Sequence, residues 1–244
     1  MSESAWARLT DAARSDGAVI GLVLTGGRGK GVWTGHSDWD GLLVVTDAAV
    51  DRWRDRDPGD LDLTVLGTTA FETYAEPFTS FAWRGYDFAR LTAAVDRGGF
   101  QAALDRKGRL APEAAEVIAE EAIGGALNQI YRAAKNQRDG AARAVRLDLV
   151  EFVAYLLTSL FALEGRHRPY NKLLAWDLDK ERLRAVAADV FLADVDAVAG
   201  DADLAAAWRL EAVLEASCAS VGVTRTLADW EDHLTVVRPR PDAS

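Results

Sequence analysis

Two aspartates separated by one residue, Asp38 and Asp40, begin an apolar stretch that ends at Val45. Successive residues of a β-strand point to opposite faces, so both carboxylates are expected on one face of a strand Trp39–Val45. Trp39 then points to the other face. Carboxylate oxygens are hard ligands of the kind that Mg²⁺ prefers. The pair therefore predicts a divalent metal site where this strand begins.

A glycine-rich turn, Thr25–Gly35, precedes the aspartates and follows a buried strand expected at Val19–Leu24. Glycines let backbone N–H groups approach phosphate oxygens closely, and successive amides in a turn can bind an anion. Glycine and aspartate are also common turn residues, so neither part indicates a function alone. The combination between two apolar strands predicts a site for a metal ion and phosphate groups.

A third carboxylate is expected from the segment Leu61–Leu66, in which apolar and polar residues alternate as in a half-buried strand. If this strand pairs beside the strand of Asp40, Asp62 projects toward the aspartate pair. The alternative is that Asp62 is only a polar residue on a half-exposed strand. Asp60 is expected to be a turn residue.

Thr25-Gly26-Gly27, followed by Ser37-Asp38-Trp39-Asp40 and an apolar strand, resembles the signature of the polymerase-beta-type nucleotidyltransferases. The resemblance is closest to the small bacterial branch that includes the aminoglycoside nucleotidyltransferases. In that superfamily a Gly-Ser or Gly-Gly pair contacts nucleotide phosphates, two aspartates bind two divalent metals, and a third carboxylate completes the site. Gly27 stands where serine is most common.

The resemblance implies a Mg²⁺-dependent enzyme that moves a nucleoside monophosphate from a nucleoside triphosphate, with ATP favoured, to an acceptor hydroxyl, releasing pyrophosphate. Two Mg²⁺ ions would be held by Asp38, Asp40 and Asp62, and Asp62 would take the acceptor proton. The acceptor is expected to be a small hydroxylated, cationic molecule such as an aminoglycoside. The residues expected to contact the nucleotide are Thr25, Gly26, Gly27, Arg28, Ser37 and Lys172.

Lys172 lies in a second candidate segment, Gly165–Trp176, which is the most basic part of the chain. Its sequence from Arg168 onward resembles the basic helix that faces the nucleotide in this branch, so Lys172 is expected to reach the triphosphate. For Arg166 and Arg168, a surface turn with snorkelled cations, whose stems lie along the protein and whose charges face water, is an equal alternative.

The glycine-rich turn also contains two cations and is followed by a histidine. Arg28 or Lys30 could counter the charge of the leaving pyrophosphate, whereas His36 is expected to be a solvated loop residue. The turn does not match a P-loop, because Lys30 is followed by Gly31 where serine or threonine is needed.

Two other classes of function stay open. One is a binding module without catalysis that keeps the nucleotidyltransferase fold. The other is a toxin-type enzyme that modifies a hydroxyl of a protein or an RNA. The formal net charge of −10 argues against nucleic acid held by general phosphate attraction. The same charge favours a cationic acceptor.

The composition, 49% hydrophobic and 27% charged, is that of a globular protein. The single cysteine, Cys218, is expected to be a buried structural thiol and fits a reducing cytoplasm. No stretch reaches the roughly 18 to 20 apolar residues of a membrane span, so a cytoplasmic protein is expected.

The order of patterns predicts an α+β fold, with a small mixed β-sheet in residues 1–110 followed by a helical bundle in residues 111–244. The resemblance implies that the first is the nucleotidyltransferase domain and the second the acceptor-binding domain. A further strand is expected at Ala89–Asp96, and Thr68–Gly85 is expected to be irregular or helical. Each of the helices Asp179–Val198 and Asp201–Ser220 is expected to begin at an aspartate cap. The remaining helices are expected at Ser4–Ser15, Phe100–Lys107, Glu113–Arg138, Arg143–Leu163 and Thr224–His233.

Overall fold

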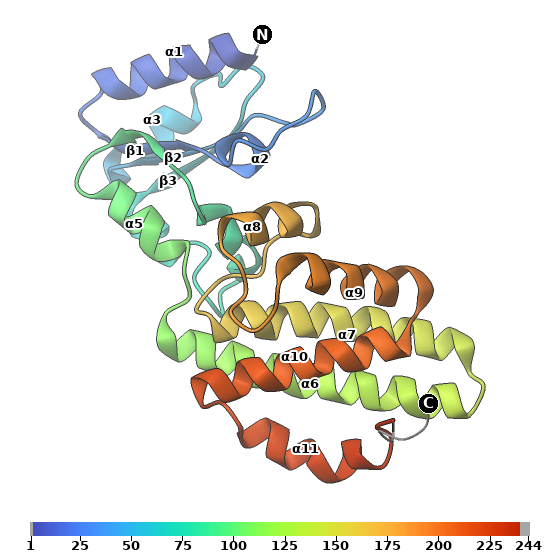
Figure 1. Ribbon diagram of the computed structural model, residues 1–244. Helices are drawn as coiled ribbons and strands as arrows, with labels where there is room; N and C mark the ends of the chain where they lie inside the picture. Colours follow the sequence, from blue (N-terminus) through green and yellow to red (C-terminus); the bar gives the residue numbers. More distant parts are fainter. Residues whose placement is uncertain (1, 240–244) are drawn as a thin grey trace. The chain divides into compact units, whose positions relative to one another are not determined.

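The computed structural model describes residues 2–239, and the chain divides into two compact units, Met1–Arg109 and Leu110–Ser244 (Figure 1). The first unit holds a small mixed sheet and the second is helical, so the expected α+β fold is confirmed. No helix in the described part of the chain is long and apolar enough to cross a membrane.

The sheet of the first unit has four strands in the order β3-β2-β1-β4. β1 pairs antiparallel with β2 and with β4, whereas β2 and β3 are parallel. A parallel pair requires a crossover, which η1 (Asp47–Ala49) and α3 (Val50–Arg54) supply. The strands are β1 (Val19–Leu24), β2 (Asp40–Val45), β3 (Asp62–Gly67) and β4 (Ala93–Asp96).

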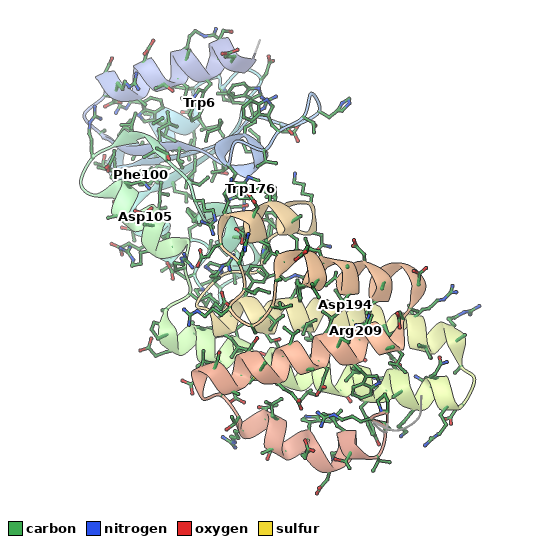
Figure 2. All side chains as sticks on the ribbon, viewed as in Figure 1. Trp6, Phe100, Asp105, Trp176, Asp194 and Arg209 are labelled. Carbon is green, nitrogen blue, oxygen red and sulfur yellow. The ribbon has the colours of Figure 1, made fainter. Side chains whose placement is uncertain are left out.

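Each face of the sheet has its own apolar cluster. α1 (Ser2–Ser15) and α3 contribute to the cluster that contains Leu43 and Val45. The opposite cluster contains Leu42 and Val44 of the same strand, as expected from alternation. Figure 2 shows Trp6 and Phe100, which pack against the two different clusters.

The second face is covered by α4 (Thr68–Thr73), η2 (Ala82–Phe88) and α5 (Phe100–Lys107). Gly21 in β1 permits the contact with α5, because a Cβ atom there would lie 2.1 Å from the ring of Phe100. α5 has the bounds that the sequence predicted.

β4 begins at Ala93 and not at Ala89, so the first half of the predicted strand is wrong. Ala89 caps η2 instead. The side chain of Gln101 forms hydrogen bonds with backbone groups at the start of the strand and just before it. It accepts from the N–H of Ala93 at 2.8 Å and donates to the carbonyl of Leu91 at 3.1 Å.

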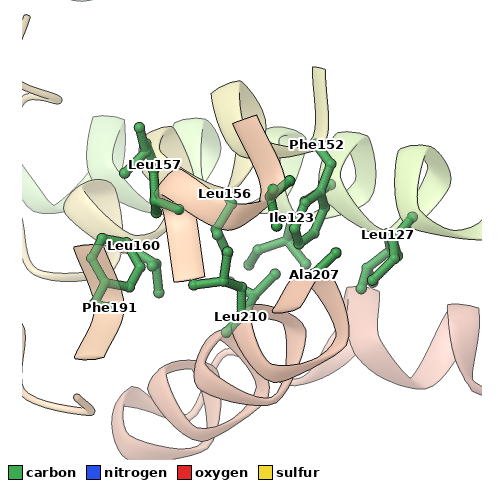
Figure 3. Close-up of a cluster of buried hydrophobic side chains, with 14 of the residues drawn as sticks. Ile123, Leu127, Phe152, Leu156, Leu157, Leu160, Phe191, Ala207 and Leu210 are labelled. Atoms are coloured by element: carbon green, nitrogen blue, oxygen red, sulfur yellow. The ribbon is translucent and has the colours of Figure 1, made fainter. Parts of the chain in front are cut away.

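The second unit is built around α6 (Pro112–Arg138) and α7 (Ala142–Leu163), which pack side by side (Figure 1). Their apolar faces meet α9 (Ala188–Asp201) and α10 (Leu204–Val221) in one core. Figure 3 shows Ile123, Leu156 and Leu210 in this core. The remaining elements are η3 (Asn171–Leu173), α8 (Leu174–Lys180) and α11 (Arg225–Thr235).

An ion pair on the surface of this unit joins α9 to α10. Nη2 of Arg209 lies 2.6 Å from Oδ1 of Asp194 (Figure 2). Cys218 of α10 is fully buried, and burial raises the pKa of its thiol to about 12. The thiol is therefore a core group, as the sequence predicted.

The single helix expected at Asp179–Val198 is wrong, because α8 ends at Lys180 and α9 begins at Ala188. The backbone leaves the helix between them, where the N–H of Arg184 donates to Oε1 of Glu164 at 2.8 Å. This bond joins residues far apart in the sequence.

The aspartate caps expected at Asp179 and Asp201 are also wrong. α9 follows Ala187, and Asp201 is the last residue of that helix. Asp203 caps α10 instead, since its Oδ1 accepts from the N–H groups of Ala205 at 2.8 Å and Ala206 at 3.1 Å. An aspartate cap therefore does begin α10, two residues later than expected.

Candidate active site

Asp40 and Asp62 are the first residues of the parallel strands β2 and β3, and their Cα atoms are register partners. Register partners in neighbouring strands project to the same face of a sheet. Asp38 lies two residues before the start of β2 and is exposed. β2 itself begins at Asp40, one residue later than expected. The fold therefore brings Asp62 beside Asp40, with Asp38 two residues away along the chain.

The electrostatics of Asp40 reflect this crowding of carboxylates. Burial of its carboxyl group is the first cause that raises the pKa of Asp40 above its ordinary value. The negative charges of Asp62 and then Asp38 raise this pKa further. Asp87 adds a smaller effect of the same sign, and the positive charge of Arg84 opposes it. A bound cation would relieve the repulsion among these carboxylates.

The glycine-rich turn contacts Asp40 directly. It contains one short helical turn, α2 (Gly26–Gly29), and Gly26 has a φ of +61°. A Cβ atom on Gly26 would lie 2.7 Å from Oδ2 of Asp40, so this position suits glycine in both conformation and space. The N–H of Thr25 donates to the carbonyl of Asp40 at 2.8 Å. The two predicted parts of the site are thus in contact.

Gly27 has a packing reason to lack a side chain. A Cβ atom there would lie 2.5 Å from the carbonyl oxygen of Val32. The chain folds back at this point, and the N–H of Val32 donates to the carbonyl of Gly27 at 2.7 Å. The serine that is most common in the resembling family does not fit this turn.

Arg28 and Ser37 stabilise the loop that carries Asp38. Nε of Arg28 donates to the carbonyls of Ser37 and Asp38, each at 3.1 Å. The guanidinium carbon of Arg28 lies 4.5 Å from the ring centroid of Trp39. Oγ of Ser37 accepts from the N–H of Thr34 at 2.9 Å. Both side chains thus stabilise the conformation of the loop. Their contact with a nucleotide stays a prediction.

Lys30 has a different position from the one expected for a pyrophosphate ligand. Its side chain is buried, and Nζ donates to the carbonyls of Tyr86 at 3.1 Å and Asp87 at 3.2 Å. The carbonyl of Ala89 accepts from the same ammonium group. Lys30 therefore joins the glycine-rich turn to η2. His36 is exposed, as predicted.

Two charged residues near Asp40 were not found from the sequence. Asp87 and Arg84 both lie in η2, and Nε of Arg84 is 3.0 Å from Oδ2 of Asp87. The only local signal is their spacing of three residues, which favours an ion pair in a helix. Their effect on Asp40 depends on the long-range packing of η2 against the sheet.

The donor types of the site suit Mg²⁺, since Asp38, Asp40 and Asp62 offer only carboxylate oxygens. Asp38 and Asp62 are exposed and Asp40 is half-buried. Among residues 2–239, however, no group of three or more His, Cys, Asp or Glu side chains is arranged to hold a metal ion. The donors fit the ion, and a complete set of ligands is not formed.

The basic residues of the second candidate segment belong to the second unit. Lys172 is exposed in η3, and its contact with a triphosphate stays a prediction. Arg166 is buried and forms an ion pair with Asp177. Nη1 of Arg168 donates to the carbonyl of Ala154 at 3.1 Å. Arg166 thus holds the second unit together, and the surface turn considered for it is wrong. Arg168 is half-buried.

No protein-family model and no curated protein sequence matches this chain. Among solved structures, the chain is similar to a nucleotidyltransferase-like protein from Exiguobacterium sibiricum 255-15. The identity is 12% and the TM-score 0.42, over 98% of this chain and 81% of that one. A similarity at this level establishes no shared family.

Proposed function

We propose that this chain is a Mg²⁺-dependent nucleotidyltransferase. The observation that carries the proposal is the register pairing of Asp40 with Asp62, at the point where Gly26 packs against the Asp40 carboxylate. Asp38 adds a third negative charge that acts on Asp40. Carboxylates on adjacent strand ends beside a glycine turn are suited to hold metal ions and a nucleotide phosphate together.

The phosphates would contact the first part of the turn. The N–H groups of Gly29, Lys30, Gly31 and Val32 donate to carbonyls of the turn or of Thr25. Phosphate binding therefore falls to the N–H groups of residues 26–28. The positive charge of Arg28 lies beside them, fixed on the carbonyls of the Asp38 loop. Lys172 of the second unit is proposed as a further phosphate contact.

Asp38, Asp40 and Asp62 would hold two Mg²⁺ ions. The bound ions supply Lewis-acid stabilisation of the charge on the oxygens at the reacting phosphorus. Asp62 is exposed at the edge strand, which leaves its carboxylate accessible to the hydroxyl of an acceptor. It would accept the proton of that hydroxyl as the nucleoside monophosphate is transferred and pyrophosphate leaves.

The proposed acceptor is a small hydroxylated, cationic molecule, and the second unit is its proposed binding domain. The support is electrostatic, because a chain with a formal net charge of −10 attracts cations. ATP is the favoured donor, and an aminoglycoside is the first acceptor to examine.

The test is pyrophosphate release from ATP, GTP, CTP and UTP with Mg²⁺, against a panel of aminoglycosides and other amino alcohols. Release should require one acceptor and should fall about a hundredfold or more in Asp40→Asn, because a metal ligand is lost. The matched control is Asp60→Asn, which removes an exposed carboxylate two residues before Asp62. Equal losses in both variants, or full activity in Asp40→Asn, would refute the metal assignment.

A binding module without catalysis is the second candidate. Two observations favour it: the lack of a formed metal-binding group among the described residues and the missing hydroxyl at Gly27. This candidate predicts that ATP raises the melting temperature while no pyrophosphate is released with any acceptor. A toxin-type enzyme would instead release pyrophosphate only with a protein or RNA acceptor.

A further inference from the structure

A pocket of about 570 Å³ opens beside the edge strand β3, and all of its lining residues belong to the first unit. Sites for small molecules have volumes of roughly 300 to 1,000 Å³. The lining comes from β3, from α4 and from the segment that follows α4, and includes Thr64, Tyr74 and Phe81. The pocket is therefore large enough for a molecule with one or two rings.

The pocket lies on the same face of the sheet as the candidate active site. Thr64 follows Asp62 by two residues in β3, so the two side chains share a face. Leu66, two residues further, also lines the pocket. A ligand in the pocket would thus contact β3 two to four residues after Asp62, on the face to which Asp62 projects.

The charges around the pocket differ from those of the whole protein. The formal net charge of the chain is −10, yet none of the described residues that line the pocket is acidic. Two arginines, Arg54 and Arg84, do line it, and Arg84 also forms the ion pair with Asp87. Nη2 of Arg54 donates to the carbonyl of Val65 at 3.3 Å, which holds its guanidinium at the β3 edge. This composition favours an anion over a cation.

The aromatic residues of the pocket favour a flat ligand. The rings of Tyr74 and Phe81 have centroids 5.3 Å apart and an interplanar angle of 33°. Phe81 is 48% exposed although it is apolar, so a ring surface is open to solvent. The Arg84 guanidinium carbon lies 5.8 Å from the Tyr74 ring centroid. Aromatic faces beside guanidinium groups bind planar, negatively charged groups well.

The segment that joins the two aromatic rings of the pocket contains backbone strain. Ala75 and Phe78 have φ angles of +60° and +64°, which residues with a side chain rarely adopt. Both lie in the segment between Tyr74 and Phe81 that carries the two rings. Residues with strained backbone angles are frequent in ligand-binding segments, because the strain can hold side chains in the arrangement that binding requires.

We propose that this pocket is a binding site for a small planar aromatic anion. The rings of Tyr74 and Phe81 contact the flat body, and the guanidinium group of Arg54 attracts the negative charge. The proposal does not depend on nucleotidyl transfer, since it concerns binding in the absence of nucleotide. Because a nucleotide is itself a planar anion, the experiment includes ATP as a competitor.

The experiment measures binding of naphthalene-2-carboxylate and of its uncharged analogue 2-naphthalenemethanol by titration calorimetry. The carboxylate should bind about tenfold more tightly than the alcohol, as expected for a charge-assisted hydrogen bond. Arg54→Gln should remove most of this preference. Displacement of the carboxylate by ATP would identify the nucleotide as the planar anion, and simultaneous binding would identify a separate aromatic acid.

Two tryptophan substitutions on α4 separate occupancy of the pocket from general effects. Ala70→Trp places an indole in the pocket and should abolish binding, because Ala70 lines it and is exposed. Glu72→Trp places the same group on an exposed position of the same helix outside the lining and should leave binding unchanged. If Ala70→Trp does not fold, Ser80→Trp blocks the opposite wall.

Three results would overturn the proposal. The first is the absence of binding by the carboxylate to the wild-type chain at millimolar concentration. The second is equal affinity for the carboxylate and the alcohol. The third is binding that persists in folded Ala70→Trp or Ser80→Trp, because the ligand would then occupy another part of the molecule.

Discussion

The carboxylate of Asp40 lies against the backbone of Gly26, and a Cβ atom on this glycine would be 2.7 Å from Oδ2. The contact joins the glycine-rich turn to the strand that begins with the aspartate. It places the first amides of the turn and the candidate metal ligand next to each other. Much of the chemistry proposed for this chain depends on that proximity.

Gly26→Ala should therefore disturb both the turn and the carboxylate. The backbone angle of +61° alone costs an alanine about 1 kcal/mol, and displacement of the Asp40 carboxylate adds to this. Unfolding in urea measures the loss, and Mg²⁺-dependent ATP binding measures the effect on the site. The control is Gly31→Ala, which has a φ of +74° but open space around its Cβ position. Equal effects of the two substitutions on ATP binding would show that the contact with Asp40 is not important.

Gly27→Ser restores the residue that is most common in the resembling family, and we expect it to impair this protein. The new Cβ atom would meet the carbonyl of Val32 at 2.5 Å, so the turn must shift. The expected loss of stability is about 1 to 3 kcal/mol, as for other overpacked positions. The melting temperature of Gly27→Ser is compared with that of Gly35→Ser, where nothing lies within 4 Å. A stability equal to that of the wild type, with stronger nucleotide binding, would contradict this explanation.

Lys30→Met tests whether the buried ammonium is structural. The substitution leaves the carbonyls of Tyr86, Asp87 and Ala89 without this donor, so we expect a loss of about 2 kcal/mol or more. Unfolding in guanidinium chloride gives the value. Arg106→Met, at an exposed position of α5, removes a surface cation and should cost little. A phosphate ligand would behave in the opposite way, with unchanged stability and a raised KM for the nucleoside triphosphate.

A pH dependence is expected from the second unit. Glu211 of α10 is 3% exposed. Burial raises the pKa of its carboxyl group, and the hydrogen bond from Arg238 opposes this with a smaller effect. The resulting pKa of Glu211 is about 7, compared with an ordinary value of 4.5. Since the folded chain holds this proton more tightly than the unfolded chain, its contribution to stability decreases as pH rises from about 4.5 to about 7.

Glu211→Gln should remove that decrease, because the amide does not titrate. Melting temperatures of the two proteins from pH 4.5 to 7.5 test this, with Glu116→Gln at an exposed position of α6 as the control. The curves of wild type and Glu116→Gln should fall together relative to the flatter curve of Glu211→Gln. Parallel curves for all three proteins would mean that Glu211 does not titrate in this range.

Local patterns in the sequence were sufficient to predict those helices and strands whose apolar and polar residues alternate with a short period. The alternation in Leu61–Leu66 predicted β3 within one residue, and with it the place of Asp62 in a strand. β1 and α5 have the predicted bounds, and α6 begins one residue before the predicted start. In each case the apolar side chains that define the pattern are the ones that the sheet or the bundle buries.

The tertiary structure decided the features that depend on residues far apart in the chain. The ammonium group of Lys30 donates hydrogen bonds to carbonyls of η2, more than fifty residues away. The same packing of η2 places Asp87 close enough to Asp40 to raise the pKa of Asp40. The break before α9 likewise depends on Glu164. The sequence by itself determined β1, β3, the aspartates and the glycine turn, because these follow from spacing along the chain. It did not determine which polar groups satisfy one another, because that depends on which surfaces the folded core brings together.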